Sequence, residues 1–133
     1  MAKITGLAFT TFTVDTSADV ATDIRNDTTS LTWATPRAVL DVTGLDKSAY
    51  ERLLGLADAS FSATGVFNAA LSHTVFSTIP STSVQRDVVI GVGGVSLSGK
   101  YLLTDYSLSR GADGALTWTV PGVLADGTTP TWA

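Results

Sequence analysis

The sequence predicts a mainly β protein, built as an antiparallel β-sandwich or curled sheet with one packed α-helix. Three observations predict this class. Threonine and serine together supply 34 of the 133 residues, and threonine favours strands while serine favours turns. Several segments alternate apolar and polar residues, which is the period of a half-buried strand. One segment alone, residues 46–58, carries a well-developed helical stripe.

The first third of the chain predicts one strand followed by a long hairpin. Residues 7–14 combine aromatic, β-branched and threonine side chains and predict a strand. Residues 24–34 alternate hydroxyl and apolar side chains and predict a second strand. Pro36 then turns the chain, because proline fixes its own φ and disfavours the helical region for the residue before it. Residues 38–43 are predicted to return as the partner strand, so the hairpin spans residues 23–43.

A helix is predicted over residues 46–58. Asp46 can cap its free N–H groups, and Leu45 can pack against Tyr50 as a hydrophobic staple. The apolar stripe that would pack on the sheet consists of Ala49, Leu53 and Leu56, joined by Tyr50, Leu54 and Ala57.

The second half of the chain predicts a β-meander. Glycine-rich turns at residues 93–94 and 111–114 separate its later strands. Residues 68–78 are ambiguous, because their apolar residues recur every four positions and also permit a short helix. Pro121 and Gly122 end regular structure, and residues 122–133 form an irregular arm. The strands are predicted over residues 60–67, 84–92, 102–109 and 115–120.

Composition excludes several classes of protein. A chain of 133 residues has room for one core, so residues 1–133 are predicted to form a single domain. The absence of cysteine excludes thiolate catalysis, thiolate zinc sites and disulfides. The formal net charge of 8 minus 12, or −4, argues against tight nucleic-acid binding. No run of residues is apolar enough for a membrane span or a signal peptide, so we expect no membrane contact and synthesis in a cytoplasm.

No group of residues in the sequence indicates catalysis. His73 is the only histidine, and we interpret it as a partly exposed polar residue rather than the base of a triad. Residues 91–99 match neither a nucleophile elbow nor a dinucleotide fingerprint, and they are interpreted as a hairpin turn. We therefore predict no enzyme activity, no cofactor and no metal. Four carboxylates at four-residue spacing are interpreted as solvated loop side chains, with a low-affinity cation site as the alternative: Asp15, Asp19, Asp23 and Asp27.

The three tryptophans divide into two groups. Trp33 and Trp118 fall at inward positions of predicted strands and are interpreted as core residues. Trp132 stands almost at the C-terminus without an evident partner in its own subunit, so we interpret it as a docking anchor for another molecule.

Two stretches of the chain resemble a known family. Residues 30–54 contain the segments Thr35-Pro36-Arg37 and Asp46-Lys47-Ser48, and residues 102–122 contain the turn Arg110-Gly111-Ala112-Asp113-Gly114. In combination these segments resemble the major tail proteins, or tail tube proteins, of long-tailed phages of actinobacteria. The resemblance extends from about residue 24 to residue 132.

This resemblance implies a structural virion protein that polymerises into stacked rings, usually of six subunits, forming the conduit for DNA ejection. It would be assembled in the host cytoplasm and reside in the virion tail, with the tape measure, tail terminator and baseplate or tip proteins as partners. Six subunits with about four strands each give roughly 24 strands and a barrel about 37 Å across before tilt, wide enough for a DNA duplex.

The wall of such a conduit must not bind its cargo. Carboxylates and hydroxyls satisfy this requirement, since lysine and arginine would hold phosphates by counterion release. We therefore predict that DNA passes without specific binding along a wall formed by Asp87, Asp105, Ser107, Ser109, Thr117 and Thr119.

The segments 23–43 and 122–133 are predicted to bridge to other subunits, because they are the least able to bury themselves within one subunit. The contact residues expected there are Trp33, Pro36, Arg37, Val39, Pro130 and Trp132. Two alternative functions are a capsid decoration or tail-completion protein and a carbohydrate-binding β-sandwich that uses exposed tryptophans.

Overall fold

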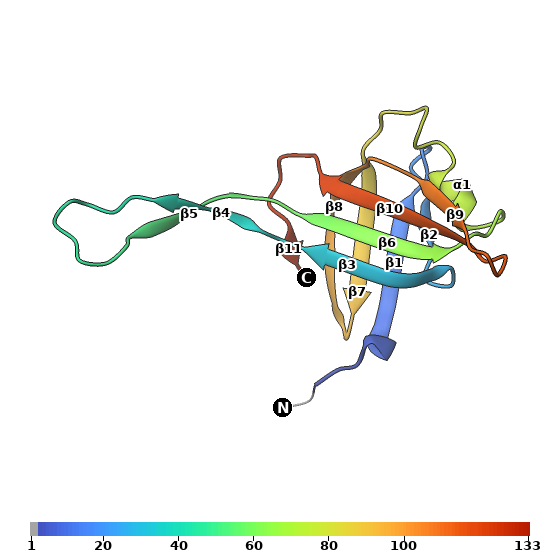
Figure 1. Cartoon of the computed structure of the whole chain (residues 1–133), viewed down its shortest axis with the longest axis horizontal. Helices are drawn as coiled ribbons and strands as arrows, with labels where there is room; N and C mark the ends of the chain where they lie inside the picture. The colour runs from blue at the N-terminus through green and yellow to red at the C-terminus, as the bar shows by residue number, and fades with distance from the viewer. Residues whose placement is uncertain (1–2) are drawn as a thin grey trace.

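A computed structural model describes residues 3–133 and contains two crossing β-layers and a projecting two-stranded arm (Figure 1). The first layer consists of β1 (Phe9–Asp15), β2 (Ala21–Asp23), β7 (Arg86–Val92) and β8 (Val95–Leu103). The second consists of β3 (Thr28–Ala34), β6 (Ser60–Val66), β9 (Ser107–Arg110) and β10 (Leu116–Leu124). The remaining elements are η1 (Gly6–Ala8), β4 (Arg37–Asp41), β5 (Arg52–Ala57), α1 (Ser72–Phe76) and β11 (Thr131–Trp132).

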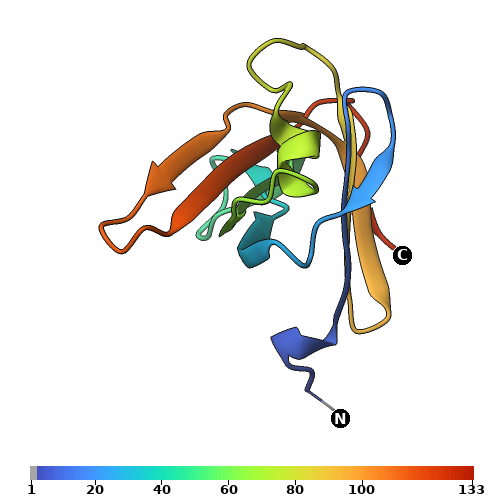
Figure 2. The same ribbon diagram turned by 90° about the vertical axis from the view of Figure 1, so that its right-hand side faces the viewer.

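Both layers belong to one curled antiparallel sheet with the order β2-β1-β7-β8-β10-β6-β3. The sheet bends where β8 meets β10, because these two strands share only the pairs from Gly122↔Leu103 to Leu124↔Tyr101. Figure 2 shows the layers crossing at a large angle, with α1 closing one end. The predicted fold class, a mainly antiparallel β protein with one short helix, is therefore confirmed.

The core lies between the two layers and is built from the inward residues of the alternating strands. Phe12 packs edge-to-face on Phe61 at 6.1 Å between ring centroids, and Phe61 on Tyr101 at 5.2 Å. Trp118 is fully buried, and its indole Nε1 donates to the carbonyl oxygen of Val66 at 2.9 Å. The prediction that Trp118 is a core residue is thus confirmed. At the open end of the core, Phe76 of α1 packs against Trp118 with ring centroids 5.0 Å apart.

Two buried polar side chains hold α1 in place. The Arg86 guanidinium donates to the carbonyl oxygen of Val75 and, at 2.8 Å, to the hydroxyl of Thr78. Burial lowers the pKa of Arg86 and the nearby Asp15 carboxylate raises it, and an arginine stays charged in either case. The Asp27 carboxylate accepts a hydrogen bond from the Ser72 backbone N–H at 3.1 Å. The ambiguous segment 68–78 therefore contains the single α-helix of residues 3–133.

The strand pairing around the arm differs from the predicted one. Strands β3 and β4 do not pair, because β3 pairs with β6 and β4 pairs with β5. The chain instead runs straight on through Pro36 from the body into the arm, and returns along β5 (Figure 1). The predicted hairpin over residues 23–43 is therefore wrong, and the hairpin connection lies ten residues further on, at residues 42–51.

The predicted helix over residues 46–58 is also wrong. Residues 52–57 form β5, and the cap and staple residues Asp46, Leu45 and Tyr50 lie in the connecting loop. The four-residue spacing of apolar side chains suggested a stripe that would bury against the sheet. No sheet face lies beside this segment, so cross-strand pairing with β4 decides its conformation.

The remaining strands largely follow the predictions, with two differences. Strand β8 begins directly after the Gly93-Gly94 turn, and the predicted strand 102–109 divides into the end of β8 and the separate strand β9. Strand β10 continues through Pro121 to Leu124, so the prediction that Pro121 and Gly122 end regular structure is wrong. Its partner changes at that point from β9 to β8, so the missing N–H of the proline removes no ladder bond to either strand. Within residues 3–133, no helix is both long and apolar enough to cross a membrane.

Candidate assembly surfaces

The outer face of the second layer is covered by uncharged hydroxyl groups. Ser30, Thr64, Thr119 and Ser107 form one cross-strand row over all four strands. Because side chains alternate along a strand, every second residue from this row also points outward. These residues include Thr32, Ser60, Ser62, Ser109 and Thr117. The other outward positions of these strands hold Ala34, Val66, Pro121 and Val123. We call this surface the hydroxyl face.

The residues predicted to line a channel fall on two different layers. Ser107, Ser109, Thr117 and Thr119 share the hydroxyl face. Asp105 precedes β9 at its margin, where its carboxylate accepts from the Ser107 hydroxyl at 2.6 Å.

Asp87 lies on β7 of the other layer, 3.1 Å from the Lys100 ammonium. This ion pair and the hydrogen bond in it raise the pKa of Lys100. The structure thus groups five of the six predicted residues and separates Asp87, whose neighbours in space the sequence does not reveal.

The second layer ends in two free strand edges. Strand β3 pairs only with β6, and β9 pairs only with β10, so within residues 3–133 the outer edge of each has no partner. Unpaired edges in a sheet are templates for pairing with another chain. The positions of these edges do not follow from the local sequence, because strand order is set by contacts between residues far apart in the sequence.

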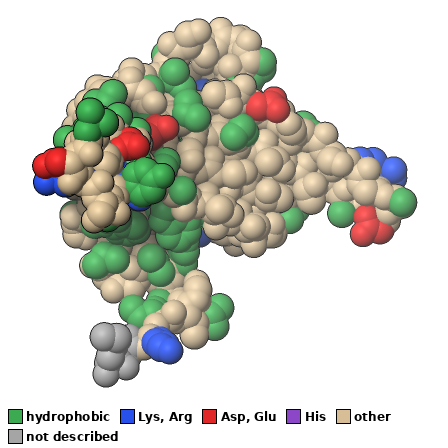
Figure 3. Space-filling model, turned by 60° about the vertical axis from the view of Figure 1, so that its left-hand side comes forward, with side chains coloured by type: hydrophobic (Ala, Val, Ile, Leu, Met, Phe, Trp, Pro, Cys, Tyr) green, Lys and Arg blue, Asp and Glu red, His purple; other side chains and the backbone are tan. Residues whose placement is uncertain are grey.

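The arm exposes apolar side chains along its whole length. Leu56 retains 89% of its accessible surface, and the set of large hydrophobic residues exposed there is Val39, Leu40, Val42, Leu45, Tyr50, Leu53, Leu54 and Leu56. Figure 3, in which the arm is turned forward, shows hydrophobic side chains open at the molecular surface. A two-stranded ribbon is only marginally stable by itself in water, and contiguous apolar patches of this kind mark interaction sites.

Polar contacts give the arm a defined shape nevertheless. The Arg37 guanidinium donates to the Gly55 carbonyl oxygen through Nε at 2.9 Å and Nη2 at 2.8 Å. Near the tip, the Thr43 hydroxyl donates to Asp41 Oδ1 at 2.6 Å and accepts from the Glu51 N–H at 2.9 Å. Three of the predicted contact residues lie in or at the base of the arm. Arg37 forms its hydrogen bonds within the arm, and Val39 is exposed. At the base, the Pro36 carbonyl oxygen accepts a hydrogen bond from the Asp58 N–H.

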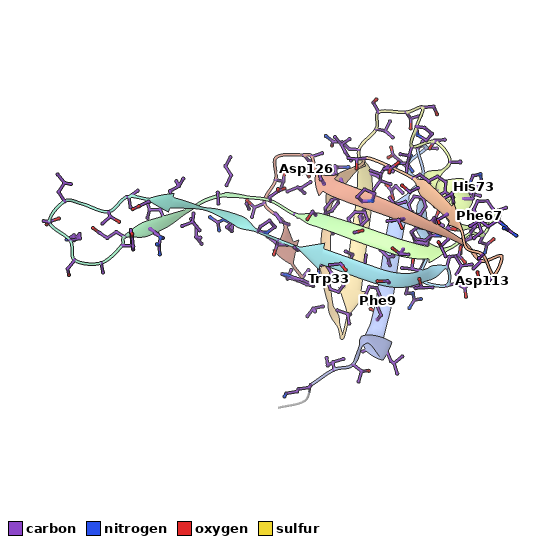
Figure 4. The ribbon with its side chains drawn as sticks, in the orientation of Figure 1. Phe9, Trp33, Phe67, His73, Asp113 and Asp126 are labelled. Carbon is purple, nitrogen blue, oxygen red and sulfur yellow. The ribbon has the colours of Figure 1, made fainter. Side chains whose placement is uncertain are left out.

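A hollow of about 870 Å³ opens between β1 and β3. Phe9 and Trp33 form its aromatic wall, edge-to-face with ring centroids 6.0 Å apart (Figure 4). Phe12, Leu31, Asp23 and Arg25 also line it, and the two charged residues pair with each other at 2.9 Å. Trp33 therefore points inward as predicted, but it borders an open space.

The C-terminal segment folds back on its own subunit. Strand β11 pairs with β8 through Thr131↔Ser98 and Trp132↔Leu97. Trp132 keeps 49% of its surface exposed, and Pro130 is half-buried. The expectation that Trp132 lacks a partner within the subunit is wrong for its backbone, which occupies an edge of β8.

His73 and the four spaced aspartates are the other polar residues singled out in the sequence. His73 Nδ1 lies 3.1 Å from the Tyr106 hydroxyl, and its ring lies beside Phe67. Asp15 and Asp27 are buried, so their interpretation as solvated loop carboxylates is wrong. Within residues 3–133, no three histidine or acidic side chains gather as potential metal ligands.

Comparison with known proteins shows the fold of the chain. No protein-family model and no curated protein matches the sequence. A chain from the tail of an empty gene transfer agent (GTA) particle, refined helically with C6 symmetry, matches with a TM-score of 0.74 and 17% identity, over 98% of this chain and 99% of that chain. A chain from the virion of the native GTA particle matches with a TM-score of 0.72 and 18% identity, over the same shares. Our chain has their fold.

Proposed function

We propose that this chain is the structural subunit of a phage-type tail tube, and that it assembles into stacked rings of six subunits that conduct DNA. The observation that carries this proposal is the arm. It exposes eight large hydrophobic residues on a ribbon that no other layer of residues 3–133 covers. Burial of such side chains contributes about 1.5–3 kcal/mol each, so a neighbouring subunit that covers the arm provides a large driving force for assembly.

The second layer supplies the ring and its wall. Strands β3, β6, β10 and β9 are antiparallel in turn, so β9 runs opposite to β3. When β9 of one subunit lies beside β3 of the next, the alternation continues without interruption. Such a head-to-tail contact closes into a ring if the rotation permits. Six copies of four strands give about 24 strands, and the fold likeness to a chain from a C6-symmetric tail supports this number.

The hydroxyl face suits the inner wall of this ring. None of its outward positions on β3, β6, β9 and β10 carries a charged side chain. DNA phosphates bind chiefly through lysine and arginine, so this wall offers no site that would hold the duplex. The proposed wall is neutral, with Asp105 at its rim, and Asp87 lies in the outer layer. The tape measure, terminator and tip proteins would be its partners at the interior and the two ends.

Electron microscopy of the purified protein tests the proposal. We expect the wild-type chain to form open-ended tubes at high concentration. The variant L54D/L56D should stay monomeric with an unchanged unfolding midpoint, because both side chains are already exposed in the subunit. Val20→Asp, an exposed valine in the loop between β1 and β2, is the matched control and should form tubes.

Three results would count against the proposal. A wild-type chain that remains monomeric at high concentration would contradict it directly. Discrete closed oligomers would instead favour a capsid decoration or tail-completion protein. Tubes formed by L54D/L56D as readily as by wild type would show that the arm does not drive assembly.

A further inference from the structure

We propose that Leu108 on β9 of one subunit seats in the hollow of a second copy, against Trp33, when β9 adds to the free edge of β3. This contact rests on the ring proposed above and assigns its residues. Leu108 is 47% exposed in the subunit although it lies on a strand, and Trp33 borders an open space although it faces inward. Each side chain therefore lacks in its own subunit the neighbour that the other would provide.

Cross-strand register fixes the side to which Leu108 points. Leu108 lies directly opposite Trp118, which is buried between the layers, so both point to the interior side of the sheet. Trp33 lies opposite Phe61, another core residue, and therefore faces the same side. In a sheet that continues from β9 into the β3 of a second copy, Leu108 must stand on the side of Trp33.

The same register places the polar residues of β9 on the opposite side. Ser107 and Ser109 pair with Thr119 and Thr117, so they extend the hydroxyl face. A slip by one residue would exchange the two sides, burying serines in the hollow and exposing Leu108 on the wall. The contact is therefore specified by both faces of the strand at once.

The hollow fits an apolar side chain at its β3 side. Its aromatic wall is made of Phe9 and Trp33, with Leu31 next to Trp33 along the face of β3. The charged residues of the hollow, Asp23 and Arg25, lie at and just after β2. They form an ion pair with each other, with 2.9 Å between Arg25 Nε and Asp23 Oδ2. Figure 4 shows Phe9 and Trp33 together on the side of the body away from α1.

Engineered disulfides test the strand pairing, since the chain has no cysteine of its own. We choose positions on the hydroxyl face, Ser109→Cys on β9 combined with Ser30→Cys or, in a second protein, with Thr32→Cys on β3. Two registers are needed because strands in a closed barrel are staggered. Within one subunit the two cysteines are separated by β6 and β10, about 14 Å at the usual strand spacing, which is too far for a disulfide.

Oxidation of assembled tubes should therefore produce a ladder of covalent oligomers from at least one of the two proteins on a non-reducing gel. The control combines Ser109→Cys with Ser98→Cys, an exposed serine on β8 of the other layer, and should produce no ladder. Oxidised monomers kept dilute should likewise remain unlinked.

Leu108→Asp tests the seating of the side chain. We expect it to raise the concentration needed for tube formation at least about tenfold, while Leu108→Met restores assembly. Tryptophan fluorescence gives a second readout, followed in a chain with Trp132→Phe, where the remaining indoles are Trp33 and the fully buried Trp118. Because Trp118 is already buried, a shift to shorter wavelength on assembly would report on Trp33. We expect this shift in the parent chain and none in L108D. Circular dichroism of the L108D monomer confirms that the body remains folded.

The outcomes separate this contact from the proposed function. If the wild-type chain forms tubes, but tubes of neither cysteine variant yield a ladder and L108D assembles normally, the contact is overturned and the tail tube proposal stands. A wild-type chain that forms no tubes would overturn both. Ladders from a cysteine pair with normal assembly of L108D would show that the strands pair without the seating of Leu108, and would overturn the assignment to the hollow.

Discussion

The body and the arm are built from the same kind of sequence but have opposite relations to water. In the body, Trp118 and Val120 on β10 are fully buried between two layers. In the arm, Leu54 and Leu56 on β5 are exposed, although they belong to an equally apolar antiparallel strand. The difference is the second layer, because a sheet buries an apolar face only against another element.

Under the proposed function, this difference separates the residues that fold the chain from those that would assemble it. Substitutions in the body should change the stability of the monomer, whereas equivalent substitutions in the arm should leave the monomer unaffected. The arm thus carries apolar surface that the monomer leaves exposed. Three pairs of substitutions measure this contrast, beginning with the largest expected effect.

The first pair is Trp118→Ala and Leu56→Ala. Removing the buried indole leaves a cavity and an unpaired Val66 carbonyl, so the free energy of unfolding should fall by about 3–5 kcal/mol. Leu56 is 89% exposed, and its replacement should change the stability by less than about 0.5 kcal/mol. Urea denaturation of dilute monomer measures both values. Equal losses would mean that the arm packs on the body in solution.

The second pair is Gly65→Ala and Gly55→Ala. A methyl group at Gly65 would collide with the Trp118 ring and with the Asp27 backbone, so we expect overpacking to cost about 1–3 kcal/mol. At Gly55 it would meet the Ala38 side chain at 3.2 Å, which a ribbon free on both faces can accommodate by a small shift. Thermal unfolding should therefore distinguish the two variants, and an equal decrease in Tm would contradict the contrast.

The third pair is Asp15→Asn and Asp41→Asn, and its effects are the smallest and opposite in sign. Burial, and then the Asp87 and Asp19 carboxylates, raise the pKa of Asp15 above its ordinary 3.8. Its charge therefore destabilises the folded body at neutral pH, so Asp15→Asn should stabilise it at pH 7. This gain should disappear below pH 3.8, where the unfolded carboxyl is also protonated.

In the arm, hydrogen bonds from the Thr43 hydroxyl and N–H lower the pKa of Asp41. The charged carboxylate therefore favours the folded arm above pH 3.8, and this contribution is lost as the pH falls through the folded pKa. Asp41→Asn should accordingly increase amide exchange near residues 42–51 at pH 7 and have no effect at low pH. Exchange that rises in the body instead would contradict the independence of the two regions.

The alternation of side chains predicted most of the body correctly. Residues 7–14, 60–67 and 84–92 alternate or mix β-branched residues, and the strands β1, β6 and β7 match these ranges to within two residues at each end. The Gly93-Gly94 turn was also predictable, since both glycines adopt positive φ, 61° and 87°. These signals are local, so no knowledge of the partner strand was required.

The arm could not be predicted from its local pattern. The stripe of Ala49, Leu53 and Leu56 has helical spacing, and the tertiary structure overrides it by pairing β5 with β4. The assembly surfaces show the same limit. The sequence indicated a hydroxyl-rich wall that includes Thr117 and Thr119, but strand order decided that Asp87 lies elsewhere.

By itself, the sequence determined the class of fold, the positions of most strands and turns, and the absence of thiols, because these follow from residue type and from spacing over a few positions. The tertiary structure alone decided which strands are neighbours, which edges stay free and which apolar residues remain uncovered. The physical reason is that pairing and burial depend on contacts between distant residues. An apolar strand is part of the core where a second layer covers it, as in β10, and stays exposed where none does, as in β5.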